Sequence, residues 1–284
     1  MRFSLSWIKY LTRFRGEKIL SQAIHMFRLH SVPFSTLLWN MFSVLELHEA
    51  KFTFPLVASV ASKNVELTRE ILKCGHEVAV HGFNHVNYSY ITERQQDNDM
   101  KWALAAYKAL DIQVYGFRAP YNVYTESSPK LVEKHGFLWD IGIGYNPKYR
   151  EGNSMFRVKI DDHESNFVCI PLSRLSDDYM IDIQRLNSIQ MEKNLKHAIK
   201  GASEKGGVIM FDLHPIRMGQ SKHVKVLNSV VKYGTELGGW FPTVTEAVKY
   251  RSKNENWKDD APFCCLLTGD IDNFTFSDYL RRLF

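Results

Sequence analysis

The spacing of apolar residues changes character near residue 52. Before that point, apolar side chains recur every three or four residues, which is the period of amphipathic helices. This spacing predicts helices over residues 5–14, 19–29 and 35–47. After residue 52, short apolar runs alternate with amphipathic segments. That alternation is typical of a single α/β fold, built in layers or as a barrel.

The short apolar runs have the length and composition of buried strands. They predict strands at residues 52–60, 77–80, 113–117, 138–143, 167–172, 207–211 and 263–268. The amphipathic segments predict helices at residues 65–74, 93–110, 187–203, 224–237 and 274–284, with another that begins near Ser128 and stops at Gly136. The polar residues 251–260 predict a surface linker.

Length and composition add limits to this picture. The chain has 284 residues, which suits one domain over 1–284, with a helical part at 1–50 and a linker, strand and terminal helix at 251–284. The 36 basic and 31 acidic side chains leave a net charge of +5, too small to indicate a nucleic-acid binder. No apolar run has the length of a membrane span. Four cysteines without a CxxC pair and the lack of a visible secretory signal favour a cytoplasmic protein with reduced thiols.

His81 and His85 are the first candidates for chemistry. They lie four residues apart at the end of a predicted strand. If the intervening residues form a helical turn, the two imidazoles project from one face and can bind one divalent metal ion. The same spacing also arises by chance in proteins that bind no metal.

Further polar groups follow other predicted strands. Arg118 and Tyr121 flank a proline after one strand, and Leu213 and His214 follow another. A histidine at such a position can be a general acid or base, or a hydrogen-bonded core residue. Near the end of the chain, Asp270 and Asp272 close an apolar strand, where two like charges are costly without a compensating cation. All of these residues follow predicted strands, and the active sites of α/β barrels lie at the carboxyl ends of the strands.

These residues resemble the polysaccharide deacetylase family, also called the NodB-homology family or carbohydrate esterase family four. The resemblance covers roughly residues 52–214. His81 and His85 match its H-x-x-x-H motif, although Val86 replaces the usual proline. Residues 118–121 match its R-x-P-Y motif, and Leu213 and His214 match its late motif. Asp177 and Asp178 match its acidic motif only loosely.

The family's first motif, an aspartate pair after an apolar strand, is missing before the histidines. Asp270 and Asp272 supply such a pair at the other end of the chain. We therefore predict a circular permutation, in which the first strand of a deformed (β/α) barrel of the NodB-homology type has moved to the C-terminus and extra helices stand at the N-terminus. Chain termini that lie close together make such a change inexpensive.

The resemblance implies a site and a mechanism. Asp272, His81 and His85 would hold a divalent metal ion of the zinc type, and no other cofactor is implied. Asp270 would be the base that activates water, although the two aspartates could exchange roles. His214 would protonate the leaving amine, and Arg118 would orient Asp270. The backbone of Tyr121 would face the oxyanion, and Leu213 would line the acyl pocket. Asp178 is a candidate to support His214 or Arg118.

Two functions compete at this point. The first is a metal-dependent de-N-acetylase of an amino sugar in cell-surface polysaccharide or O-antigen biosynthesis, acting on a nucleotide-linked or lipid-linked glycan inside the cell. An ester or formamide substrate fits the same chemistry. The second is a catalytically decayed, carbohydrate-binding relative, which Val86 and the loose acidic motif favour. The basic, aromatic N-terminal segment could also touch an anionic membrane surface, and the oligomeric state stays open.

Overall fold

The computed structural model describes residues 32–141, 154–171 and 175–281. The helices predicted at residues 5–14 and 19–29, and the basic N-terminal segment with its membrane contact, lie outside this part of the chain. Within it, none of the helices is both long enough and apolar enough to cross a membrane.

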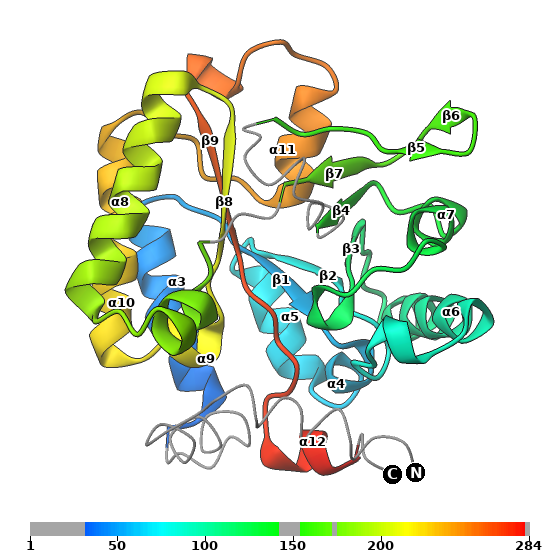
Figure 1. Ribbon diagram of the computed structural model, residues 1–284. Coiled ribbons are helices and arrows are strands. Elements are labelled where there is room, and N and C mark those ends of the chain that lie inside the picture. Colours follow the sequence, from blue (N-terminus) through cyan, green and yellow to red (C-terminus); the bar gives the residue numbers. More distant parts are fainter. Residues whose placement is uncertain (1–31, 142–153, 172–174, 282–284) are drawn as a thin grey trace.

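A seven-stranded parallel sheet forms the centre of the molecule (Figure 1). Its order is β7-β4-β3-β2-β1-β9-β8. The strands are β1 (Thr53–Leu56), β2 (Glu77–Val80), β3 (Gly116–Arg118), β4 (Trp139–Ile141), β7 (Val168–Ile170), β8 (Val208–Asp212) and β9 (Cys264–Thr268). The segment after β7 reaches β8, because the backbone N–H of Asp212 donates to the carbonyl of Leu175 at 3.1 Å. The sheet is therefore a nearly closed, deformed (β/α) barrel, as predicted.

The last strand of the chain lies inside this sheet rather than at its edge. β9 pairs with β8 over its whole length, and Thr268 is in register with Thr53 of β1. The chain continues along β1, where the Ile271 N–H donates to the Pro55 carbonyl at 2.8 Å. In Figure 1, β9 runs beside β8 and down toward the C-terminal helix. This is the location that the permutation hypothesis requires, although the permutation itself stays a prediction.

Helices cover the sheet, which is why every residue of β1, β2 and β9 is buried. They are α3 (Phe34–Leu47), α4 (Ala58–Ala61), α5 (Val65–Lys73), α6 (Glu93–Ala109), α7 (Ser128–Lys134), α8 (Ser188–Lys205), α9 (Pro215–Met218), α10 (Ser221–Glu236), α11 (Val244–Arg251) and α12 (Phe276–Arg281). A short hairpin, β5 (Lys159–Ile160) with β6 (His163–Glu164), lies beside the sheet. The long helices follow the apolar periodicity, and capping boxes at Thr92 and Asn187 start α6 and α8.

Several predicted boundaries were wrong. The strand predicted at residues 52–60 ends at Leu56, and α4 begins at Ala58. All four residues of α4 are buried, and a short buried helix has no polar face that could separate it from a strand in the sequence. The strand predicted at 113–117 starts at Gly116 and includes Arg118, because this charged side chain is neutralised inside the barrel. The hairpin, α9 and α11 were not predicted.

One of these missed elements closes the amino end of the barrel. Val244, Ala247 and Val248 of α11 pack in one apolar cluster with residues of β4, β8 and β9. A buried polar group anchors the same helix, since the Glu77 carboxylate at the start of β2 accepts hydrogen bonds from Thr53 and from the backbone N–H of Thr245. The polar residues that follow the strands lie at the opposite, carboxyl end of the barrel.

Candidate metal centre and catalytic site

The predicted site residues meet at the carboxyl end of the barrel. His81 follows β2, Arg118 ends β3, His214 follows β8, and Asp270 and Asp272 follow β9. Parallel strands bring their carboxyl ends to one side of a barrel, so residues distant in sequence become neighbours there.

Three side chains form a compact group of potential metal ligands. One ligand atom from each of His81, His85 and Asp272 lies within 4.8 Å of the others. The Asp272 Oδ1 atom is 3.2 Å from His85 Nε2 and 3.6 Å from His81 Nε2. Asp270 lies next to the group, with its Oδ2 atom 3.4 Å from His81 Nε2. Two imidazoles and a carboxylate form a donor set that suits zinc.

The environment of His81 prepares it to bind a cation. Its Nδ1 donates to the Arg118 carbonyl at 2.9 Å, which leaves Nε2 as an acceptor directed toward the aspartates. Within the described chain, this buried Nε2 makes no hydrogen bond. Burial and the nearby Arg118 lower the pKa of His81 to about 4, although Asp272 opposes the shift. The ring is therefore neutral, as a metal ligand must be.

Arg118 bridges two carboxylates across the barrel. Its guanidinium donates to both oxygens of Asp212, at 2.9 and 2.6 Å, and its Nη1 lies 3.0 Å from Asp270 Oδ1. Its Nε donates to Asn122 Oδ1 at 2.7 Å. Three strands separate β3 from β8 in the sheet, so the ion pair between Arg118 and Asp212 crosses the carboxyl end of the barrel, which we call its mouth. Asp212 was missed by the sequence reasoning, since nothing near it in the chain indicates that its partner is Arg118.

His214 is held by hydrogen bonds to Asp177, the neighbour of the aspartate that the sequence suggested. Its Nδ1 lies 2.7 Å from Asp177 Oδ1, and its backbone N–H donates to Asp177 Oδ2 at 2.8 Å. Asp178, which the sequence suggested as a support, accepts hydrogen bonds from Ser176 and from the Tyr179 N–H, and its charge helps to raise the pKa of His214. Asp177 is fully buried, and one carboxylate oxygen of Asp178 lies within 4.8 Å of the ligand atoms of Asp177 and His214.

The surroundings of His214 and Asp270, the two candidate proton carriers, raise the pKa of each. Burial favours neutral His214, but the carboxylates of Asp177 and Asp212 outweigh it and raise the pKa of His214 well above its ordinary value. Burial raises the pKa of Asp270 to about 8, with Asp212 reinforcing the shift and Arg118 opposing it. His214 is therefore protonated at neutral pH. Asp270 is also largely protonated there, and it would act as a base once a bound cation stabilised its carboxylate.

The charges of the site fit a divalent cation. Four carboxylates, those of Asp177, Asp212, Asp270 and Asp272, surround two cations, Arg118 and protonated His214. When all four are ionised, the carboxylates exceed these cations by two, which is unfavourable for like charges held this close in a buried site. A doubly charged ion beside His81, His85 and Asp272 would neutralise that excess.

The two residues predicted to bind substrate lie in different environments. Tyr121 is half exposed, and its ring centroid is 4.4 Å from that of His85. Its backbone is left-handed, with a φ of 59°, directly after Pro120. Leu213 is completely buried, and its N–H donates to the Thr268 carbonyl at 2.6 Å. Gly269 makes this approach possible, since a Cβ there would lie 2.1 Å from the Leu213 carbonyl oxygen.

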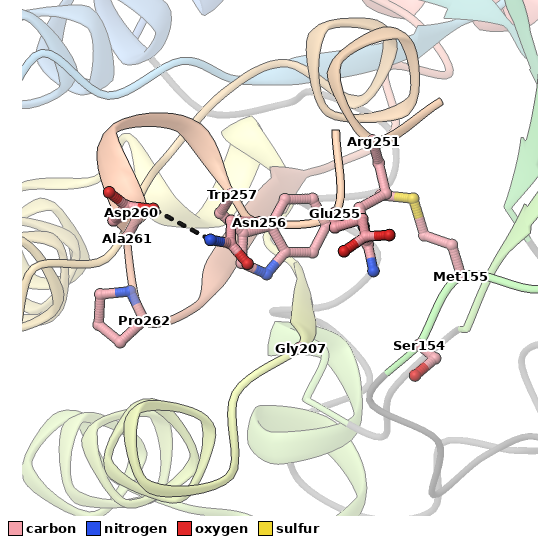
Figure 2. A pocket seen from close by; sticks show the side chains of 10 residues that line it. All are labelled: Ser154, Met155, Gly207, Arg251, Glu255, Asn256, Trp257, Asp260, Ala261 and Pro262. Carbon is pink, nitrogen blue, oxygen red and sulfur yellow. Dashed lines mark hydrogen bonds between the residues drawn. The ribbon is translucent and has the colours of Figure 1, made fainter. Parts of the chain in front are cut away.

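A cavity of about 450 Å³ lies away from this cluster, where β8 and β9 begin (Figure 2). Its lining includes Gly207, Arg251, Trp257, Asp260 and Pro262. Figure 2 shows Ser154 and Met155 facing the 251–262 segment across it. None of the predicted site residues lines it, so the chemistry is assigned to the carboxyl end, where the ionisable groups converge.

The fold and the site together define a deformed (β/α) barrel with an aspartate–histidine cluster at its mouth. The model of the polysaccharide deacetylase family matches residues 30–138. Over that segment the chain is similar to the polysaccharide deacetylase family.

Two kinds of individual protein show related similarities, in sequence and in fold. A peptidoglycan deacetylase of Helicobacter pylori is 30% identical over 98 residues, a match that covers 33% of this chain and only 33% of the relative. The structure described as a probable polysaccharide deacetylase from Pseudomonas aeruginosa PAO1 aligns with a TM-score of 0.69 at 20% identity, over 80% of this chain and 75% of that one. PuuE allantoinase aligns with a TM-score of 0.68 at 17% identity, over 78% and 74%. At these identities the two structures show a shared fold.

Proposed function

We propose that the protein is a metal-dependent hydrolase that removes the acyl group from the nitrogen of an amino sugar. The observation that carries this proposal is the convergence of three supports at one barrel mouth. These are the ligand group His81, His85 and Asp272, the Asp270 carboxylate beside Arg118, and the His214 imidazole held by Asp177. A base, an acid and a cation site within one cluster are the parts that amide hydrolysis needs.

The geometry favours one assignment of the two aspartates. Asp272 approaches both imidazoles with the same oxygen, as a metal ligand would. Asp270 contacts Arg118 through Oδ1 and leaves Oδ2 toward His81. We therefore assign Asp272 as the ligand and Asp270 as the base that takes a proton from the attacking water.

The other residues complete the proton transfers. His214 begins the reaction protonated and gives its proton to the departing amine, since a neutral amine leaves far more readily than its anion. Asp177 holds the imidazole in place through Nδ1, so the opposite nitrogen can face the substrate. Arg118 fixes the orientation of Asp270. The backbone N–H of Tyr121 and the side chain of Leu213 are assigned to the carbonyl oxygen and the acyl group.

The donor set and the excess negative charge support a divalent ion, and zinc suits two imidazoles and one carboxylate best. When bound, such an ion polarises the acyl carbonyl and lowers the pKa of water.

The substrate is proposed from the family and from the curated relative, whose name refers to peptidoglycan, a polymer of N-acylated amino sugars. We propose an N-acetylated amino sugar carried on a nucleotide or a lipid, deacetylated in the cytoplasm during assembly of a cell-surface polysaccharide. The competing interpretation is a carbohydrate-binding relative without catalysis. The loose acidic motif favours this competing interpretation. Asp177, one of the two aspartates of that motif, forms hydrogen bonds with His214 and so supports the catalytic interpretation.

Metal content and product release test this function together. The protein is stripped with a chelator, reloaded with zinc and assayed for acetate released from N-acetylglucosamine oligomers and from a nucleotide-linked N-acetylhexosamine. Asp272→Ala should lose both zinc and activity. Asp270→Asn should retain zinc but lose about 10²–10⁴-fold in rate, the usual contribution of a general base. Asp260→Ala, an exposed acid near the other end of the barrel, is the control and should match the wild type. A wild-type protein that binds no zinc and releases no acetate would refute the proposal.

A further inference from the structure

The loop that carries His85 has an unfavourable backbone conformation. It joins β2 to α6, and both Gly82 and His85 are left-handed, with φ values of 70° and 54°. A side chain in this region costs about 1–2 kcal/mol. Val86, the next residue, lacks the fixed backbone angle that a proline would provide. Contacts outside the loop must therefore hold His85 in place.

One buried carboxylate on α6 makes several of these contacts. Asp99 is only 5% exposed, and its oxygens accept the backbone N–H groups of Phe83, at 3.0 Å, and Asn84, at 3.4 Å. It also accepts the Tyr88 hydroxyl at 3.0 Å. The bonded residues flank His85 on both sides along the chain, so Asp99 fixes the path of the backbone before and after the ligand.

The opposite side of the loop is held by the backbone of α4. The N–H groups of Ala58 and Ser59 donate to the carbonyls of Gly82 and Phe83, at 3.0 and 3.1 Å. Gly82 also permits the close approach of Asp99, because a Cβ at this position would lie 2.8 Å from Asp99 Oδ2. The loop is thus held between α4 and α6, and Asp99 supplies the carboxylate on the α6 side.

We infer that Asp99 is a positioning residue of the metal centre, which holds the loop so that His85 meets His81 and Asp272 with little reorganisation. This inference rests on the metal site of the proposed function but not on the reaction. His81 follows directly from β2, so the sheet sets its position. His85 is the fourth residue after His81, so its position depends on the path of the three loop residues between them. A ligand must be held to within about 0.5 Å for tight binding, and supporting residues typically contribute 10–100-fold in metal affinity.

Calorimetric titration of the chelator-stripped 284-residue chain with zinc chloride tests this role without any substrate. Asp99→Asn keeps the size of the side chain but replaces one acceptor oxygen with a donor group that faces N–H groups. We expect its zinc dissociation constant to rise about 10–100-fold. Asp97→Asn is the matched control. Asp97 lies on the same helix and contacts Lys134 and His135 at 2.7 and 2.8 Å, away from the loop. Its zinc affinity should equal that of the wild type.

A milder variant covers the case in which Asp99→Asn does not fold, as judged by circular dichroism. Tyr88→Phe removes one of the three hydrogen bonds to Asp99 and should weaken zinc binding by a smaller factor in the same direction. Wild-type affinity in both variants overturns the inference and leaves the proposed function intact. A wild-type protein that binds no zinc overturns the metal centre itself, and the role of Asp99 with it.

Discussion

The ion pair between Arg118 and Asp212 should contribute measurably to stability, because both side chains are almost completely buried. Removing one partner of a buried pair typically costs 3–5 kcal/mol, since the other charge stays behind without water. In Asp212→Asn, Arg118 would keep Asp270 at 3.0 Å and Asn122 at 2.7 Å. We therefore expect the low end of that range, about 3 kcal/mol. For a chain of this size, that corresponds to a fall of about 6 °C in melting temperature.

A double-mutant cycle can separate this pair from general destabilisation. Arg118→Met and Asp212→Asn should be less than additive in their unfolding free energies by about 1 kcal/mol or more, because each removes the same interaction. Asp182→Asn is a matched control, since Asp182 is also buried and forms a 2.6 Å ion pair, but with Arg217. Its effect should add to that of Arg118→Met. An unchanged melting temperature in Asp212→Asn, or strict additivity with Arg118→Met, would refute the reasoning.

Two further predictions concern pH. Asp177 is the strongest of the charges that raise the pKa of His214, so Asp177→Asn should move the alkaline limb of the kcat–pH profile to lower pH; a limb that stays in place would contradict the role of His214 as the acid. Burial, aided by Lys51, lowers the pKa of His76 from 6.5 to about 4. The unfolded chain therefore takes up this proton first as the pH falls, so the stability due to neutral His76 is complete above pH 6.5 and is lost toward pH 4. In His76→Leu, the loss in unfolding free energy between about pH 7 and pH 5 should be roughly 2 kcal/mol smaller than in the wild type. Urea denaturation at the two pH values measures this loss. An equal loss in the variant and the wild type would contradict the prediction.

Much of the barrel could be predicted from the sequence, because apolar periodicity is a local property. The strand at Glu77–Val80 was predicted with its observed bounds, and the long helices differ from prediction by a few residues. The boundaries that were predicted wrongly also have physical reasons. β1 and α4 form one continuous buried run, and β3 extends to a charged residue that no hydrophobic pattern would place in a strand.

The residues of the candidate site also fall into two groups, those that the sequence indicates and those that it does not. The residues at the ends of apolar strands, including His81, Arg118, His214 and the late aspartates, could be selected from the chain alone, since a polar group after a buried strand is visible as a break in the pattern. Asp99, Asp177 and Asp212 could not be given roles. Arg118 and Asp212 are 94 residues apart, and Asp177 and His214 are 37 apart.

The sequence by itself determined which strands form and which polar side chains follow them, because both depend on neighbouring residues. Only the tertiary structure decided how those side chains pair. The order of the strands places β9 between β1 and β8, and this brings Asp270 and Asp272 to histidines nearly two hundred residues earlier in the chain. Charge pairing in a buried site depends on distances through space, and these exist only once the barrel has closed.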